Sequence, residues 1–229
     1  MPSLPYLRRA AAWLALAAFL LPRAAADVVI NEVMAASSDR LLRWDANGVP
    51  YLGWGTRWYA AAFNDASWAT GAGPFGYGTL TNGPVAIATN LQARLQYLSP
   101  TSYFRKSFTV SAGNQALPDQ VQLVVEYNDG FVAYLNGVEV ARRNAGPASK
   151  FIYHDQPAYN REAFSGTAPI PTTTNTETIS LGAASAKLTV GANVLAIHLL
   201  NASASDTTFY LKASLQIASA SPVDRKSVV

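Results

Sequence analysis

The chain has no cysteine, and this absence sets the first limits on its chemistry. No disulfide can stabilise it, and neither a thiolate nucleophile nor a cysteine-ligated metal is possible. Only two histidines are present, too few for a zinc site unless carboxylates complete the ligand set. The fold must therefore be held by burial of apolar side chains and by backbone hydrogen bonds.

The N-terminus has the pattern of an export signal. Arg8 and Arg9 precede an uncharged apolar run over residues 10–21, and a run of alanines then offers a cleavage site before Asp27. This pattern predicts a secretory signal peptide over residues 1–26. The rival interpretation, a membrane anchor, needs a longer apolar run to span a bilayer.

No excess of charge remains once this leader is removed. Arg8, Arg9 and Arg23 account for the whole formal net charge of +3, so residues 27–229 are formally neutral. They contain no basic cluster, which argues against nucleic acid as a partner, and no apolar stretch long enough for a membrane span. We expect a secreted protein, either extracellular, at the cell surface or in the periplasm, whose length suits a single β-sandwich.

Alternation of apolar and polar residues is the main structural signal. Val121, Leu123 and Val125 share one face of an extended run, and similar runs follow on both sides of Asn136-Gly137. Asn-Gly between alternating runs predicts a type I′ hairpin, so we expect a three-stranded meander over residues 121–142.

Further strands are expected elsewhere, and no stretch beyond the leader has sustained helical periodicity. Because the expected elements are strands, the fold class is all-β. In one of these strands, Lys106 falls on the same face as Phe104 and Phe108, which requires a bulge or a rim position there. The further strands are predicted over residues 27–36, 103–110, 178–181, 194–200 and 209–217.

Three segments occurring in this order resemble the galactose-binding-like jelly roll: residues 104–108, 130–140 and 191–197. That domain is the non-catalytic sugar-binding domain of family 2 glycoside hydrolases and also occurs in large secreted bacterial proteins. The resemblance implies a jelly-roll β-sandwich over residues 44–219. Its matching elements are structural, so they indicate a fold more strongly than a function.

Two terminal segments stand outside that domain. Residues 29–35 resemble the opening strand of bacterial lamin-tail domains, so we assign residues 27–43 as an N-terminal strand of that type. Residues 220–229 form a tail without a strand pattern. Residues 224–229 can be back-translated into a nucleotide sequence that resembles a sequencing adapter. We therefore expect a truncated or artefactual end there.

No catalytic constellation emerges from the sequence. Residues 71–76 match G-x-G-x-x-G, but no hydrophobic strand precedes them and Pro74 occupies the turn, so we interpret them as a Gly-rich loop. His198 lies within an apolar strand pattern and is expected to be a packed residue rather than a base. No serine has a nucleophile-elbow context, and we expect no enzymatic activity from this chain.

Binding residues are sought instead among side chains in or beside loops. Exposed aromatic rings stack on sugars, and planar polar groups bond their hydroxyls. The resemblance further implies a structural calcium ion, for which Asp45 with Asn47 and Asn64 with Asp65 offer oxygen ligands. Turn capping is the favoured role for these four, so we name no metal ligand and no cofactor. The candidates for carbohydrate binding are Trp54, Tyr77, Arg142, Tyr153, His154 and Arg161.

These observations favour a secreted, non-catalytic β-sandwich module. We expect it to bind a polysaccharide or other glycan, or to brace neighbouring domains of a longer extracellular or cell-surface protein. One alternative is the N-terminal fragment of a secreted polysaccharide hydrolase or protease whose catalytic domain is missing. Another is a structural spacer without a ligand.

Overall fold

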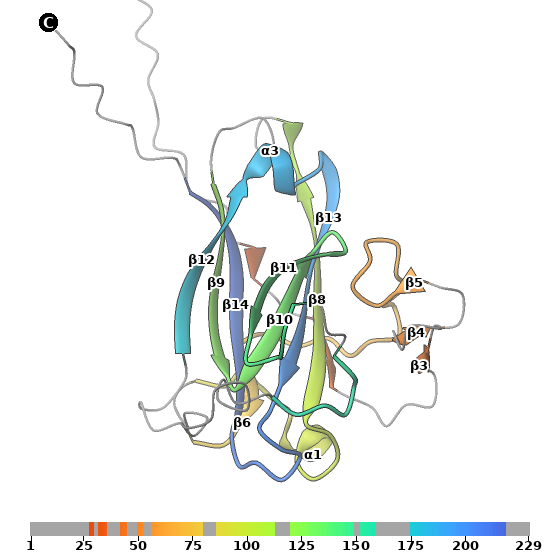
Figure 1. The fold of residues 1–229 in the computed structure, drawn as a ribbon, viewed down its shortest axis with the longest axis vertical. Helices are drawn as coiled ribbons and strands as arrows, with labels where there is room; N and C mark the ends of the chain where they lie inside the picture. Colours follow the sequence, from red (N-terminus) through yellow and green to blue (C-terminus); the bar gives the residue numbers. More distant parts are fainter. Residues whose placement is uncertain are drawn as a thin grey trace, which may run out of the picture.

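The computed structural model describes residues 57–79, 86–112, 120–148, 152–158 and 175–218, together with the backbone of short strands between residues 28 and 56. Strands dominate these residues (Figure 1). The strands are β1 (Val28–Val29), β2 (Glu32–Ala35), β3 (Leu42–Trp44), β4 (Pro50–Leu52), β5 (Thr56–Arg57), β6 (Phe75–Tyr77), β7 (Thr89–Asn90), β8 (Thr101–Val110), β9 (Gln120–Asn128), β10 (Gly130–Leu135), β11 (Val138–Arg143), β12 (Asn175–Ala183), β13 (Gly191–Leu200) and β14 (Phe209–Ala218). Two four-residue helices are described, α1 (Gln92–Leu95) and α3 (Ala184–Lys187).

The long strands form two sheets. Sheet A has the order β12-β9-β14-β6-β7, with β1 also pairing with β14, and sheet B has the order β11-β10-β13-β8-β2. The short strands β3, β4 and β5 make a separate small sheet beside them. This two-layer arrangement confirms the predicted all-β sandwich.

The chain path through the sheets is that of a jelly roll. Among β6 and β8 to β14, only the β10–β11 connection stays within one sheet, and each other connection crosses from one sheet to the other. The eight strands thus form two four-stranded layers, β12-β9-β14-β6 against β11-β10-β13-β8. Eight strands wound in this way bury one face of each layer against the other.

The predicted meander is half right. β10 and β11 form the expected hairpin, with Asn136 and Gly137 at φ 53° and 87° in its turn. The strand β9, however, pairs with β12 and β14 in sheet A, while β10 lies in sheet B. The alternating pattern identified three strands correctly but did not reveal that Asn128-Asp129 carries the chain across the sandwich.

The N-terminal segment contributes to both layers of the sandwich. β1 pairs with β14 at Val28 opposite Leu215, and β2 pairs with β8 at Val33 opposite Phe104. The predicted single strand over residues 27–36 is therefore two short strands on different sheets. The lamin-tail resemblance of this segment stays a prediction.

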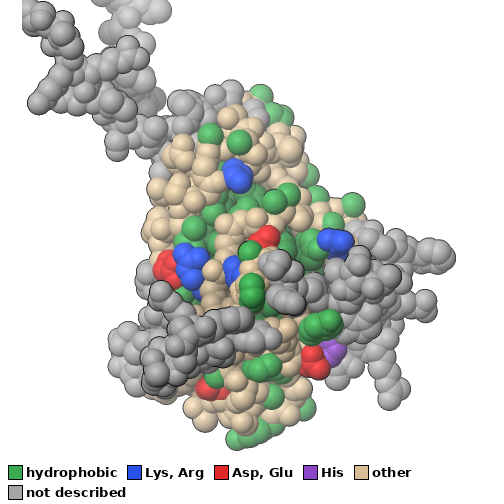
Figure 2. All heavy atoms as spheres, in the orientation of Figure 1, with side chains coloured by type: hydrophobic (Ala, Val, Ile, Leu, Met, Phe, Trp, Pro, Cys, Tyr) green, Lys and Arg blue, Asp and Glu red, His purple; other side chains and the backbone are tan. Residues whose placement is uncertain are grey.

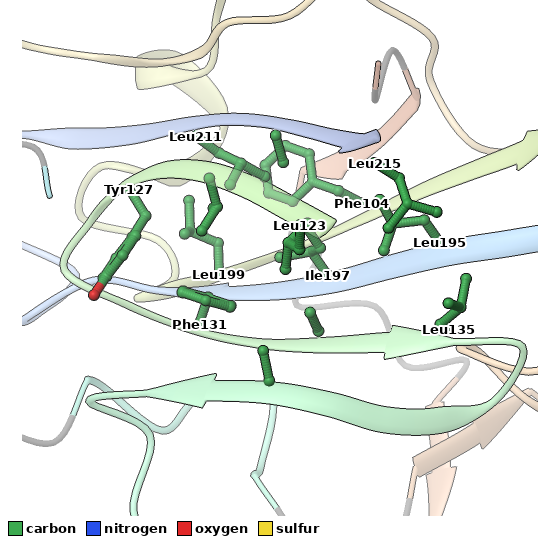
Figure 3. Packing of buried hydrophobic residues seen from close by; sticks show 14 of the residues in the cluster. Phe104, Leu123, Tyr127, Phe131, Leu135, Leu195, Ile197, Leu199, Leu211 and Leu215 are labelled. Carbon is green, nitrogen blue, oxygen red and sulfur yellow. The ribbon is translucent and has the colours of Figure 1, made fainter. Parts of the chain in front are cut away.

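The core lies between the two sheets and is built by alternate residues of each strand (Figure 3). Leu123 of β9 and Leu211 of β14 pack from sheet A against Phe104, Ile197 and Leu199 of sheet B. Each of these side chains is fully buried, which stabilises the fold by roughly 2 kcal/mol per large residue.

Two strand details follow from packing and register. β8 pairs with β13 without a register shift, so half-buried Lys106 occupies the predicted rim position and not a bulge. Gly76 lies so close to β14 that a Cβ there would come within 2.0 Å of the Phe209 carbonyl oxygen. The Gly-rich segment over residues 71–76 thus ends in β6, where glycine is needed because the backbone of β14 lies so close. No helix of the described chain follows this segment directly. Within the same described residues, no helix is long and apolar enough to cross a membrane.

Candidate functional site

Several connections meet at one end of the sandwich, where β8 begins and β13 ends, with Thr101 opposite Leu200. We call this the loop end; it comprises residues 96–101, 128–130, 144–148, 152–158 and 201–208. Figure 1 shows it at the bottom of the molecule, around α1, whereas α3 lies at the opposite end. Loops supported by a rigid β-scaffold are the usual place for binding residues.

Hydrogen bonds join three of these loops into one surface. The backbone N–H of Asn201 donates to the Pro100 carbonyl at 2.7 Å, and the N–H of Ala158 donates to the Asn201 carbonyl at 2.7 Å. The Thr101 hydroxyl donates to the carbonyl of His154. The loop over residues 152–158 is therefore fixed to the start of β8 and to the end of β13 in sheet B.

Two of the predicted sugar-binding residues lie together on that loop. Tyr153 is 44% exposed, His154 is half-buried, and both lie between the buried anchors Ile152 and Ala158. The N–H of Gln156 donates to the Tyr153 carbonyl at 3.2 Å, which closes a turn beneath the two side chains. An aromatic ring and planar polar side chains are thus presented on a turn whose ends are buried.

Arg142 lies near the end of β11, and its guanidinium already donates to neighbouring groups of the chain. Its guanidinium donates to both carboxylate oxygens of Glu139 at 2.8 Å and to the Ala145 carbonyl at 2.6 Å. The side chain is only 10% exposed. In this structure Arg142 braces the chain where β11 ends.

The sheet beneath carries a row of cross-strand neighbours. Arg142, Val132, His198 and Tyr103 lie side by side on the outer face of sheet B. His198 stacks on Tyr103 with ring centroids 4.3 Å apart, and Trp58 meets both rings edge-on or tilted. The expectation that His198 is a packed residue is confirmed by its 2% exposure.

Burial shifts the pKa values of two members of this row, His198 and Tyr103. It lowers the pKa of His198 to about 3, with smaller contributions from the positive charges of Arg142 and His154. It also raises the pKa of Tyr103 above the usual range of a phenol. A neutral imidazole with so low a pKa, shut off from solvent, is a poor general base at neutral pH.

Of the remaining three candidates, the structure describes only Tyr77, which does not add to this surface. Tyr77 is fully buried in β6, where it stacks on Phe209 and accepts a hydrogen bond from the Asn201 amide at 3.0 Å. Its burial raises the pKa to about 12, and its ring has no exposed face for a sugar, so the expectation for Tyr77 is corrected. Trp54 and Arg161 lie outside the described residues.

Of the four oxygen-bearing residues considered for calcium, two can be placed. The Asn64 side-chain oxygen accepts from the N–H of Ala66 at 3.0 Å, which is the predicted turn cap. Asp65 instead forms an ion pair with Arg105 at 2.8 Å. Asp45 and Asn47 lie outside the described residues, and within them no group of three or more acidic or histidine side chains has a metal-binding arrangement.

Arg105 is the structural residue that sequence reasoning missed. It lies on the outer face of sheet B with 1% exposure and donates to Asp65 and to the carbonyls of Trp58 and Ala60. It also lies 5.1 Å from the centroid of the Phe63 ring. We call residues 57–68 the covering segment, because Arg105 holds them over sheet B.

A second buried charge, Asp129, lies at the loop end. Its carboxylate accepts from the N–H of Ala202 at 2.7 Å and from the Asn128 amide at 2.9 Å, with only 3% exposure. Burial raises its pKa to about 7, partly offset by the bond from Ala202, and Asp206 raises it further. Asp129 thus ties the loop after β13 to the crossing between β9 and β10.

The opposite end contains a groove between the β10–β11 turn and α3. It has a volume of about 550 Å³, and its walls include Leu135, Val138, Leu188 and Val190. Val138 and Val190 are 62% and 59% exposed. None of the predicted site residues that the structure places lies at this groove.

Comparison with known proteins gives no family assignment by sequence. None of the known protein-family models matches the chain, and no curated protein matches it. Similar solved structures include a glycosyl hydrolase family 2 member from Bacteroides cellulosilyticus DSM 14838, at 12% identity and a TM-score of 0.44, covering 84% of this chain and 21% of that one. A β-glycosidase from Bacteroides vulgatus has 14% identity and a TM-score of 0.41, covering 83% of this chain and 20% of that one.

A β-glucuronidase from an uncultured Clostridium sp. has 11% identity and a TM-score of 0.41, covering 87% of this chain and 30% of that one. The chain therefore spans less than a third of the length of these proteins. All three similarities are low, and the fold assignment rests on the strand order described above. The galactose-binding-like assignment stays a prediction.

Proposed function

We propose that this chain is a secreted, non-catalytic β-sandwich module that binds carbohydrate through its loop end. The observation that carries the proposal is the placement of Tyr153 on a turn fixed to sheet B at both ends. A tyrosine ring offers an apolar face to the C–H groups of a sugar at a low entropic cost when its backbone is already ordered. His154 and Gln156 beside it supply planar groups that can bond hydroxyls.

The charges near the loop end support binding over catalysis. Glycoside hydrolysis needs two carboxyl groups facing a common cleft, one of them held protonated. Among the described carboxyl groups of the loop end, Asp129 is buried under the loop after β13, Asp206 accepts from the Thr208 N–H at 2.9 Å, and Asp155 is exposed on the loop over residues 152–158. His198 is sequestered beneath the covering segment. Asp129, Asp206 and His198 thus each have a structural role that explains their position.

The proposal is tested by retention of the purified protein on gels that contain soluble polysaccharides, chosen by a glycan array. We expect retention on at least one neutral polysaccharide, and we expect Tyr153→Ala to weaken binding about tenfold, which corresponds to roughly 1.4 kcal/mol. Tyr153→Phe keeps the ring and is expected to keep most of the affinity.

Val190→Ala is the matched control, because it removes an exposed apolar side chain at the opposite end of the sandwich. It should leave retention unchanged. Free migration of the wild-type protein in every polysaccharide gel would instead assign the chain as a spacer. Hydrolysis of any of these polysaccharides by the purified chain would contradict its assignment as non-catalytic.

A further inference from the structure

A second exposed aromatic residue lies at the tip of the loop end. Tyr97 is 72% exposed and the adjacent Leu98 is 68% exposed, the two largest exposed fractions among the large hydrophobic side chains of the described chain. Figure 2 shows hydrophobic side chains at the lower extremity of the molecule, where Figure 1 places α1. Sequence reasoning gave no signal for this pair, because neither residue belongs to an alternating or helical pattern.

The backbone holds Tyr97 outward in a conformation that tyrosine rarely adopts. Its φ is 65°, in the left-handed region where a side chain is strained. The N–H of Tyr97 donates to the Ala204 carbonyl at 2.6 Å, and the N–H of Leu98 donates to the Leu95 carbonyl at 2.9 Å. Fully buried Leu95 anchors the turn in the main core. The strained conformation is therefore held by backbone hydrogen bonds of Tyr97 and of the residue that follows it.

Groups that bond hydroxyls lie on the residue before Tyr97 and on the loop to which Tyr97 is bonded. The Gln96 amide donates to the Asp206 carbonyl at 3.2 Å and accepts from the Gln92 amide at 2.7 Å, so both glutamines are oriented beside the tip. Ser203 and Ser205 share a hydrogen bond of 3.1 Å on the loop that binds the Tyr97 N–H. Amides and hydroxyls around an aromatic face are the chemistry of a neutral sugar site.

The charged side chains nearby do not favour an anionic or a cationic ligand. Arg94 and Asp206 contribute one charge of each sign at the tip, and His154 and Asp155 lie together on the neighbouring loop. On the face drawn in Figure 2, acidic and basic side chains are interspersed rather than gathered by sign. The ligand class that fits is an uncharged glycan.

We infer that Tyr97 is a second sugar-stacking residue and that, together with Tyr153, it selects a chain of several neutral sugar units over a single sugar. This inference rests on the proposed function. Both tyrosines project from loops that bond to the same connection, since Tyr97 binds Ala204 and Ala158 binds Asn201. Two stacking residues on one rigid surface bind two units of the same chain, and linked contacts multiply affinity.

Tyr97→Gly is the decisive variant, because glycine adopts φ near 65° without strain. We expect its thermal midpoint to be unchanged or higher than that of the wild-type protein, so any loss of binding is not a folding defect. Isothermal titration with the retained polysaccharide and its short oligosaccharides should give about a tenfold weaker association for the long chain. Affinity for a disaccharide should not change, and Tyr97→Phe should restore the long-chain value.

The outcomes separate the two proposals. Equal long-chain affinity for Tyr97→Gly and the wild type, with Tyr153→Ala still weakened, would overturn the second stacking residue and leave the proposed function in place. A Tyr97→Gly variant that alters only self-association in sedimentation equilibrium would assign the tip to a protein contact and also overturn the inference. Absence of any polysaccharide binding by the wild type would overturn both.

Discussion

Replacing Arg105 with alanine tests how the covering segment is held on sheet B. The guanidinium donates to the Asp65 carboxylate at 2.8 Å, to the Ala60 carbonyl at 3.1 Å and to the Trp58 carbonyl, and it is 1% exposed. Removing one partner of a buried ion pair costs about 3–5 kcal/mol. Because Asp65 is 26% exposed and can regain water, we expect the lower part of this range, about 3 kcal/mol.

The loss is measured by urea unfolding followed by tryptophan fluorescence. Arg105→Lys keeps the charge, but a lysine lacks the planar guanidinium that bonds the Asp65 carboxylate and two backbone carbonyls at once. This variant should therefore recover only part of the lost stability. Arg143→Ala is the matched control, because Arg143 is 39% exposed and pairs with Glu177 at 2.7 Å across the edge of the sandwich. Breaking so exposed a pair should cost less than about 1 kcal/mol.

The pKa of His198 provides a second measurement of the same change. Loosening the covering segment admits water to the outer face of sheet B, so the pKa of His198 should rise from about 3 towards the usual value of a histidine. An NMR titration of the imidazole measures this directly. An Arg105→Ala variant that loses no more stability than Arg143→Ala, with His198 still titrating near pH 3, would refute this account of the segment.

Two further predictions concern Asp129 and Gly76. The native pKa of Asp129 is raised from 3.8 to about 7, so its contribution to stability is complete below pH 4 and is lost as pH rises to 7, by about 4 kcal/mol in total. His198 has the opposite effect, because its lowered pKa reduces the stability of the fold as pH falls. The test is therefore the difference in the free energy of unfolding between Asp129→Asn and the wild type, measured by urea unfolding from pH 4 to 8. Parallel plots of this free energy against pH for the two proteins would contradict the buried carboxyl. Gly76→Ala should destabilise the fold by roughly 3 kcal/mol, because the added Cβ would clash with the Phe209 carbonyl. Gly191→Ala is the control: its φ is 94°, but no atom lies within 4 Å of a Cβ there. It should lose about 1 kcal/mol from backbone strain alone. Equal thermal midpoints for these two variants would show that β6 does not approach β14 as closely as described.

The strands could be predicted because alternation is a local property. The runs around Leu123, Ile197 and Leu211 show period two, and Asn136-Gly137 marks its own turn through the positive φ of both residues. Assignment of strands to layers is not local. Nothing in the alternating runs shows that β9 pairs with β12 and β14 in sheet A while β10 lies in sheet B.

The site was harder to predict, because exposure depends on partners that are distant in sequence. Tyr77 follows a Gly-rich segment in the sequence, yet Phe209 of β14 pairs with it and buries it. Arg105 is buried because Asp65, 40 residues earlier, neutralises it. Tyr153 and His154 were found because a long irregular stretch on a β-scaffold often carries exposed side chains, whereas Tyr97 is exposed through its backbone conformation.

The central claim, that this sandwich binds neutral glycan at its loop end, is tested most directly by mapping amide chemical shifts during titration with the retained polysaccharide. We predict that perturbed amides cluster in residues 96–101, 152–158 and 201–206, with little change in the groove beside α3 or on the outer strands of sheet A. Perturbations centred on that groove or on a sheet face would contradict the claim.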